Sequence, residues 1–445
     1  MKIIYLFCFL LLAFSQFFLF TIEEYKYQFI LFELSYILII VYVSYRFYFM
    51  SAISLFIFIT FFYLSAGSLD LFYFNNSDNL NAERMGLLLL FGYFFIYVLI
   101  LLWSIFENKF INFKLLEKVN NSLANTNYSQ ILYRIITVFL LFMIVLYIGK
   151  FLSMYGFSIG GVSRGDLYNT SNFILVLAKV MIPQFIIIYV WLRVTFKSKN
   201  TKIDYLVIFF IFLFIFFDMF FKGDRRVTLS TLMAIGGIYY YAKALPKQYI
   251  FIGIGGIIFL SLLGAIRNRP ISVWADNIEY YMARDFAPSD TEFGPFSMIA
   301  NYLMKDDMFL TMPTLFSSFP SVIPGFLYPE RPIGSSVWFV KTYFEDYYNS
   351  GGGFAFNIII DAALNFGYFA PIVLAIIYFL LFFLGKQKGV IGVLLTGLLI
   401  YSLTFTARFD FLSIWQSIIH GWIFVFLVFL FALFFVKYKY NAPLK

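Results

Sequence analysis

The chain is poor in charge, in cysteine and in histidine. Only 13% of its 445 residues are charged, and it has a single cysteine, Cys8, and a single histidine, His420. One cysteine excludes a disulfide within the chain, and no group of residues has the spacing of metal ligands. The charge is far below that of soluble proteins, and the hydrophobic content of 62% is correspondingly high. We therefore expect a protein of the lipid bilayer with no metal, no cofactor and no nucleic-acid partner.

Apolar segments of 17 or more residues recur along the whole chain. Each is long enough to cross a hydrocarbon core of about 30 Å at about 1.5 Å per residue. The predicted spans are 3–20, 28–45, 51–69, 86–106, 131–149, 173–192, 204–221, 227–243, 249–266, 368–385, 389–406 and 412–436. No cleavage site follows the first segment, which we interpret as an uncleaved anchor. The predicted fold class is all-α, a polytopic membrane protein with about 12 transmembrane helices.

One long segment outside the predicted bilayer divides the chain. Residues 1–266 hold spans one to nine, residues 267–353 form the large loop, and residues 354–445 hold a short re-entrant helix and spans ten to twelve. The loop contains a run of prolines, which exclude regular helix interiors, interleaved with aromatic residues suited to an interfacial depth. We expect it to lie on the membrane over the functional site, and the three parts to act as one domain.

Lysine and arginine follow different rules in this chain. With the N-terminus inside, the inner segments carry 17 Lys and Arg and the short outer segments carry 8. This bias predicts that both termini are cytoplasmic. Nine of the 12 arginines nevertheless fall on the outer side. Guanidinium binds phosphate or carboxylate through two parallel hydrogen bonds. A polyanionic ligand on the outer face explains the set, although pairing with outer acids remains the alternative for each arginine alone.

The connection between spans seven and eight has the outline of a phosphate site. It reads Lys-Gly-Asp-Arg-Arg over residues 222–226, so Arg225 and Arg226 stand at the N-terminus of an outward-facing helix. Free N–H groups and the positive end of the helix dipole point to the same place. The alternative is that Gly223 makes the turn, Asp224 caps the helix and the arginines only snorkel. The arginines expected to hold a diphosphate are Arg225, Arg226, Arg267, Arg269, Arg331 and Arg408.

A polar stripe follows the loop. Asn357, Asp361 and Asn365 recur at intervals of four residues in an otherwise apolar segment, which places them on one face of a helix. Gly367 and Pro371 mark a break before span ten. Because polar groups avoid lipid, we expect the stripe to line a cavity under the loop. A polar seam between two helices is the alternative.

Several of these features together resemble a known family. They are the outer arginines, the Gly-Asp-Arg-Arg hairpin, the proline-rich stretch that ends in Tyr-Pro-Glu-Arg-Pro at 328–332, and the Gly-Gly-Gly…Asn-Phe-Gly segment of 351–367. The chain resembles a Wzy-type O-antigen polymerase, over the whole length in topology and over about 218–245 and 313–370 in residues.

The resemblance implies a C-type membrane glycosyltransferase. Such an enzyme joins undecaprenyl-pyrophosphate-linked oligosaccharide repeat units at the outer face of the bacterial inner membrane, and a chain-length regulator is a candidate partner. Arginines would stabilise the departing diphosphate, and a general base would activate the acceptor hydroxyl. Asp361 and Glu330 are the leading candidates for the base, and His420 is a further one that a hydrogen bond within the bundle also explains. Asn357 and Asn365 would bind the substrate.

Other functions remain open at this point. An O-antigen ligase has a similar architecture, but such ligases usually carry a histidine in the large loop, and residues 267–353 contain none. A lipid-linked oligosaccharide flippase has about twelve spans as well. It needs a charged path through both leaflets, whereas Glu33 and Lys179 are the charges well inside these spans. A sugar transferase of the other C-type branch would place an acidic pair after span one, where Glu23 and Glu24 stand in a short loop.

Overall fold

The computed structural model describes a set of helices and the turns beside them. The described residues are 34, 36–43, 51–73, 79–106, 117, 126–155, 173–196, 201–222, 225–242, 315, 320, 323, 328, 330, 332–349, 356–387, 389–404, 406–416, 418–419, 426–427, 429–431 and 434. The predicted spans 3–20 and 249–266 and most of the long loop lie outside them.

Within these residues all regular secondary structure is helical. Three helices, Leu87–Phe106, Ser129–Met154 and Ile358–Gly385, are long and apolar enough to cross a membrane. Three shorter apolar helices are Ala52–Phe61, Met181–Phe196 and Gly389–Leu403. The all-helical, membrane-compatible fold class is therefore confirmed for the described residues, and the number of spans stays a prediction.

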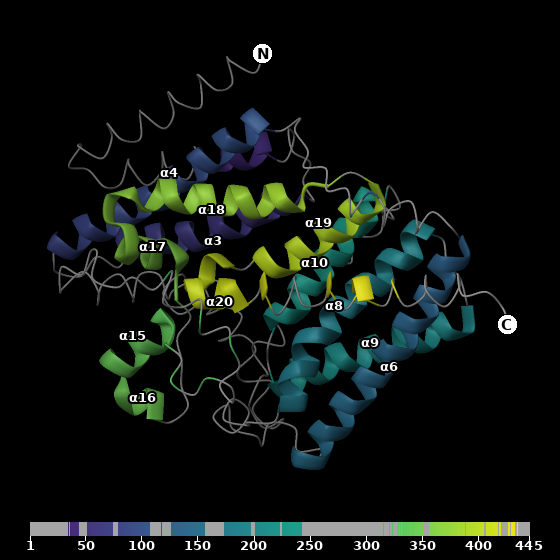
Figure 1. Cartoon of the computed structure of the whole chain (residues 1–445). Helices are drawn as coiled ribbons and strands as arrows, with labels where there is room; N and C mark the ends of the chain where they lie inside the picture. The colour runs from purple at the N-terminus through teal and green to yellow at the C-terminus, as the bar shows by residue number, and fades with distance from the viewer. Residues whose placement is uncertain are drawn as a thin grey trace.

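The longer helices form two groups joined by one helix. α3 (Ala52–Tyr73), α4 (Asn79–Phe106) and α18 (Ala370–Gly385) pack together in the first group. α6 (Thr126–Tyr155), α8 (Phe173–Phe196), α9 (Thr201–Lys222) and α10 (Arg225–Tyr241) make up the second. α19 (Gly389–Leu403) contacts α3 and α18 of the first group and α8 and α10 of the second, and it lies between the groups in Figure 1.

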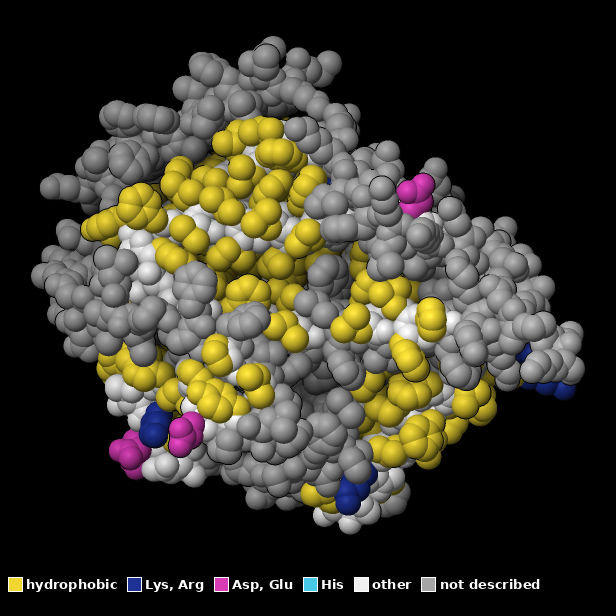
Figure 2. Space-filling model, viewed as in Figure 1, with side chains coloured by type: hydrophobic (Ala, Val, Ile, Leu, Met, Phe, Trp, Pro, Cys, Tyr) yellow, Lys and Arg dark blue, Asp and Glu magenta, His cyan; other side chains and the backbone are white. Residues whose placement is uncertain are grey.

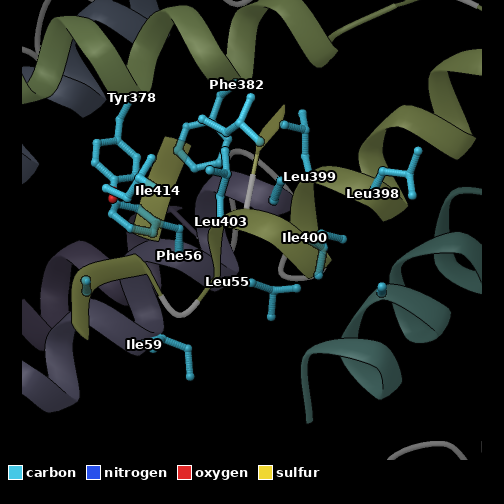
Figure 3. Packing of buried hydrophobic residues seen from close by; sticks show 14 of the residues in the cluster. Leu55, Phe56, Ile59, Tyr378, Phe382, Leu398, Leu399, Ile400, Leu403 and Ile414 are labelled. Carbon is cyan, nitrogen blue, oxygen red and sulfur yellow. The ribbon is translucent and has the colours of Figure 1, made fainter. Parts of the chain in front are cut away.

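Large apolar and aromatic side chains fill the space where α3, α18 and α19 meet (Figure 3). The rings of Phe56 and Tyr378 stack with centroids 4.5 Å apart, and both side chains are fully buried. Leu399 and Leu403 of α19 reach the same cluster. Stacked rings contribute attraction beyond the area they bury, so this cluster fixes how α18 lies on α3.

The outward faces of the bundle are apolar as well. On α6, Val138, Phe142 and Val145 are 68%, 59% and 52% exposed, whereas Leu140 and Ile144 between them are fully buried. A helix that is hydrophobic all round suits a lipid surrounding. Figure 2 shows a broad apolar surface with the described charged side chains near its rim.

Packing contacts fix the relative directions of α8, α9 and α19. Trp191 Nε1 donates to the Val390 carbonyl oxygen at 2.7 Å, and a Cβ on Gly397 would lie 3.3 Å from Ile187, so α8 and α19 are antiparallel. Arg193 lies 3.6 Å from Asp204 in the first turn of α9, which therefore runs back beside α8. We name the end of the bundle where α8 ends and α9 begins the Asp204 end. α10 begins, and α19 finishes, at the opposite end.

The helix before α18 is interrupted where glycine was expected to interrupt it. α17 (Ile358–Phe366) ends at Gly367, which has a φ of 55°, and η4 (Gly367–Phe369) leads into α18. A positive φ of this size is readily adopted by glycine and rarely by residues with a Cβ. Pro371 stands in the first turn of α18, where its missing N–H is not needed. That α17 is re-entrant in a membrane stays a prediction.

Candidate functional site

Five short helices gather at the end opposite Asp204. α15 (Ser335–Tyr343) and α16 (Glu345–Asn349) close the long loop, and α17 follows it. η5 (Thr406–Arg408) and α20 (Phe411–Gln416) form the connection after α19, and η5 contacts both α3 and α17. We name this region the Asp361 end, because Asp361 of α17 lies at its centre.

Asp361 is fully buried and accepts hydrogen bonds from three elements. Ser335 Oγ of α15 donates to its Oδ1 at 2.7 Å, and Asn365 Nδ2 of α17 approaches the same oxygen at 3.3 Å. The backbone N–H of Phe411, the first residue of α20, donates to Oδ2 at 2.8 Å. The first four N–H groups of a helix lack partners within the helix, so a buried carboxylate is a strong acceptor for them. Asp361 thus binds the starts of two helices.

Asp410, like Asp361, accepts hydrogen bonds from residues at the starts of α15 and α20. Its side chain is 1% exposed, and it is the residue before α20. Ser413 donates to Oδ1 through its N–H at 2.9 Å and through its hydroxyl at 2.6 Å. Ser336 of α15 donates to Oδ2 through its N–H at 3.0 Å and through its hydroxyl at 2.9 Å. Asp410 therefore caps α20 locally and α15 across space.

A second contact holds an earlier part of the long loop. Leu315 donates its N–H to Asn365 Oδ1 at 3.0 Å, and its carbonyl oxygen accepts from Trp415 Nε1 at 3.2 Å. Asn365 is itself fixed, since its Nδ2 donates to the Asp361 carbonyl oxygen at 2.7 Å. Two places in the loop, around 315 and 335–336, are therefore bound by polar groups of α17 and α20.

The predicted polar stripe is present on α17, and its members have different surroundings. Asn357 is the N-cap of α17 and accepts from the Ile359 N–H at 2.8 Å, so its side chain has a local role. Asp361 and Asn365 bind the loop, as described above. Glu330 is exposed, and no hydrogen bond of its side chain is among those described. His420 lies outside the described residues.

The predicted phosphate-binding arginines are described in backbone position only, or not at all. α10 begins at Arg225, so Arg225 and Arg226 occupy the first two positions of a helix, as predicted. Arg408 is the last residue of η5. Both positions are at the Asp361 end of the bundle. The side chains of these three arginines, and the whole of Arg267, Arg269 and Arg331, lie outside the description.

At the Asp204 end, a buried carboxylate is bound by tyrosine hydroxyls and lies near an arginine. Asp204 is 3% exposed and accepts hydrogen bonds on Oδ1 from the hydroxyls of Tyr133 and Tyr189. Arg193 Nε is 3.6 Å from Oδ2. The two tyrosine rings stack at 5.5 Å. This cluster ties α6, α8 and α9 together, and the sequence reasoning did not single it out.

The serine partners of Asp361 and Asp410 were also missed. Sequence periodicity finds residues on one helix face, whereas Ser335, Ser336 and Ser413 meet the carboxylates across 26, 74 and 3 positions of the chain. The only local signal was Asp410 itself, an N-cap residue directly before an apolar segment. Among the described residues, no group of three or more His, Cys, Asp or Glu side chains gathers that could hold a metal ion.

Comparisons with protein-family models, with curated protein sequences and with solved structures gave no match.

Proposed function

We propose that the chain is a polymerase of lipid-linked oligosaccharide repeat units, acting at the outer face of a bacterial inner membrane. In this proposal the chain spans the membrane about twelve times with both termini in the cytoplasm, and the Asp361 end faces outward. The donor would be a glycan on undecaprenyl pyrophosphate, and the acceptor a hydroxyl at the non-reducing end of the next unit. The enzyme would be a metal-independent glycosyltransferase.

The observation that carries the proposal is where α10 begins. Its first two residues are arginines, and they share an end of the bundle with Arg408 at the close of η5. The free N–H groups and the dipole of a helix start favour an anion there, and arginine adds donors in a fork that matches a diphosphate. A diphosphate leaving group needs this stabilisation as the glycosidic bond forms.

The lengths of the helices support a site recessed from the outer surface. α19 has 15 residues and α10 has 17, so each rises about 22 to 26 Å, which is less than a hydrocarbon core of about 30 Å. Irregular backbone at such a depth is tolerated where protein buries it or where it lines a water-filled cavity. At the Asp361 end, the carboxylates of Asp361 and Asp410 accept from three such N–H groups, those of Ser336, Phe411 and Ser413.

Reconstitution with a defined substrate tests the proposal. Purified protein in lipid nanodiscs is given an undecaprenyl-pyrophosphate-linked repeat unit, and products are separated by length. We expect a ladder of glycans that still carry the lipid. Arg225→Ala and Arg226→Ala should lower kcat about 100-fold or more, the loss seen when one stabilising donor is removed. Arg225→Lys keeps the charge but not the fork, so it should recover only part of the activity.

A gene deletion separates the competing functions. Loss of a polymerase leaves single repeat units on the lipid acceptor. Loss of a ligase leaves none attached while carrier-linked polymer accumulates, and loss of a flippase traps units inside the cell. Full-length polymer from cells that carry Arg225→Ala together with Arg226→Ala would refute the proposed diphosphate site.

A further inference from the structure

We propose that Asp361 and Asp410 are positioning residues, which hold α15 of the long loop against the connection of η5 and α20 that carries Arg408. This inference rests on the proposed function, because a fixed α15 matters to the reaction only if Arg408 beside it binds the diphosphate. We name the two carboxylates with Ser335, Ser336 and the first turn of α20 the loop latch.

The hydrogen bonds of the two carboxylates leave little capacity for another role. Each oxygen of Asp410 accepts two hydrogen bonds, from Ser336 on one side and Ser413 on the other. Each oxygen of Asp361 accepts at least one. A further donor at Asp361 Oδ1 would have to displace Ser335 or Asn365, which already donate to that oxygen. Asp361 therefore suits holding the loop better than accepting a substrate proton.

The burial of both carboxylates also favours a role in holding α15 and α20. Asp361 and Asp410 are 0% and 1% exposed, and an ionised carboxylate that is buried needs compensation. The starts of α15 and α20 supply it, since the positive ends of both helix dipoles and their free N–H groups meet at the two carboxylates. If α15 moved away with the loop, Asp361 would lose the hydrogen bond from Ser335, and Asp410 would lose those from Ser336.

The latch joins parts of the chain that the proposed reaction needs together. Ser335 and Ser336 lie in the last fifth or so of the long loop, at the start of α15. Asp361 follows the triple glycine of 351–353, and Asp410 stands two residues after Arg408. The hydrogen bonds of Ser336 to Asp410 join α15 to the residue two positions after Arg408, and Trp415 of α20 holds the loop at Leu315 as well. The position of Arg408 relative to α15 therefore depends in part on Asp410.

Hydrogen exchange measures the latch without reference to any reaction. The full-length protein in nanodiscs is compared with Asp410→Asn and with Ser336→Ala, and exchange is followed in peptides covering 335–343. We expect exchange there to rise about 10-fold or more in Asp410→Asn, because the carboxamide has one acceptor oxygen for the four donors that the carboxylate accepts. Asp204→Asn is the matched control, a buried carboxylate with hydroxyl donors at the opposite end, and it should leave these peptides unchanged. Unchanged exchange in Asp410→Asn would overturn the proposal.

Kinetics then separate positioning from proton transfer. A displaced group lowers kcat by about 10- to 100-fold while the enzyme still binds its donor. We expect Asp410→Asn and Ser336→Ala to lower kcat with KM for the lipid donor nearly unchanged, and Ser336→Thr, which keeps the hydroxyl, to restore it. Asp361→Asn should lower the plateau of the pH–rate profile without changing its shape. A profile that loses its acidic limb in Asp361→Asn would instead identify a general base and overturn the assignment.

The two assays also keep this inference apart from the proposed function. Transfer at the wild-type rate in a variant whose 335–343 peptides exchange faster would overturn the role of the latch in catalysis. If the wild-type protein transferred no glycan, the proposed function would fail and the positioning role with it, whereas the exchange result would still report the loop contact.

Discussion

Gly334 and Asp410 lie closer together than any side chain on residue 334 would allow. A Cβ built on Gly334 would stand 2.5 Å from Asp410 Oδ2 and 2.8 Å from Leu412 Cδ2. Gly334 is the N-cap of α15, and the carboxylate that blocks its Cβ is the same one that accepts from Ser336. The absence of a side chain at 334 is therefore what lets the start of α15 approach Asp410, between η5 and α20.

Gly334→Ala should loosen this approach. The added methyl group must displace Asp410, which is bound on both oxygens, or Leu412, so we expect a loss of about 1 to 3 kcal/mol in the free energy of unfolding. Thermal unfolding in detergent measures it. Gly149→Ala on α6 is the control, because a Cβ there meets nothing within 4 Å and alanine raises helix propensity. Equal stability of the two variants would contradict the close contact.

The Asp204 cluster predicts a graded loss of stability. Tyr189→Phe removes one hydroxyl donor from Asp204 and should cost about 1 kcal/mol, and Asp204→Ala should cost about 3 kcal/mol because it strands two tyrosine hydroxyls and Arg193. Unfolding midpoints in nanodiscs test the order. Tyr205→Phe is the matched control, since Tyr205 is the next residue on α9 and is 75% exposed. A cost for Tyr205→Phe as large as that for Tyr189→Phe would argue against the cluster.

The outward face of α6 predicts contact with lipid. Nitroxide labels on cysteines placed at Val138 and Phe142, with Cys8 replaced by serine, should be accessible to oxygen and protected from a water-soluble nickel complex. Tyr347 of α16 is 41% exposed in a helix with two acidic residues, and a label there should show the opposite preference. Electron paramagnetic resonance in nanodiscs measures both. Nickel access at residue 142 equal to that at 347 would rule out a lipid-facing α6.

Local features of the sequence were predictive, and contacts across the chain were not. Apolar segment length located α4 and α6 to within several residues, although α4 begins at Asn79 and not at the predicted 86. The additional turns are polar, so hydropathy does not register them as part of a span. The break at Gly367 followed from glycine and proline alone. These predictions hold because backbone propensity and apolar length are properties of a few consecutive residues.

The contacts of the candidate site were harder to predict from the sequence, for a physical reason. The prediction that Asp361 and Asn365 share one face of a helix needed only the period of a helix, and the cavity that they were expected to line stays a prediction. Which groups they meet depends on how α15, α17 and α20 converge, and that is decided by packing between segments up to 50 residues apart. A serine in a loop carries no signal of such a partner. The same reasoning explains why Asp204, at the first turn of α9, reads as an ordinary helix-start acid in the sequence.

The contact between Tyr378 and Thr406 predicts a non-additive pair of substitutions. Tyr378 Oη donates to Thr406 Oγ1 at 2.7 Å, and that hydroxyl donates to the Leu403 carbonyl oxygen at 2.7 Å. Both side chains are fully buried. Tyr378→Phe keeps the ring against Phe56 and should cost about 1 kcal/mol, whereas Thr406→Val leaves a buried hydroxyl without an acceptor and should cost about 2 to 3 kcal/mol.

In the double variant that stranded hydroxyl is gone, so Tyr378→Phe should cost little or nothing once Thr406 is valine. The free energies of unfolding of the wild type, the two single variants and the double variant, measured in one detergent, give the double-mutant cycle. Costs that add within about 0.3 kcal/mol would mean that the two hydroxyls do not interact. A coupling of about 1 kcal/mol would show that this hydrogen bond ties η5 to α18, and with it the backbone of Arg408.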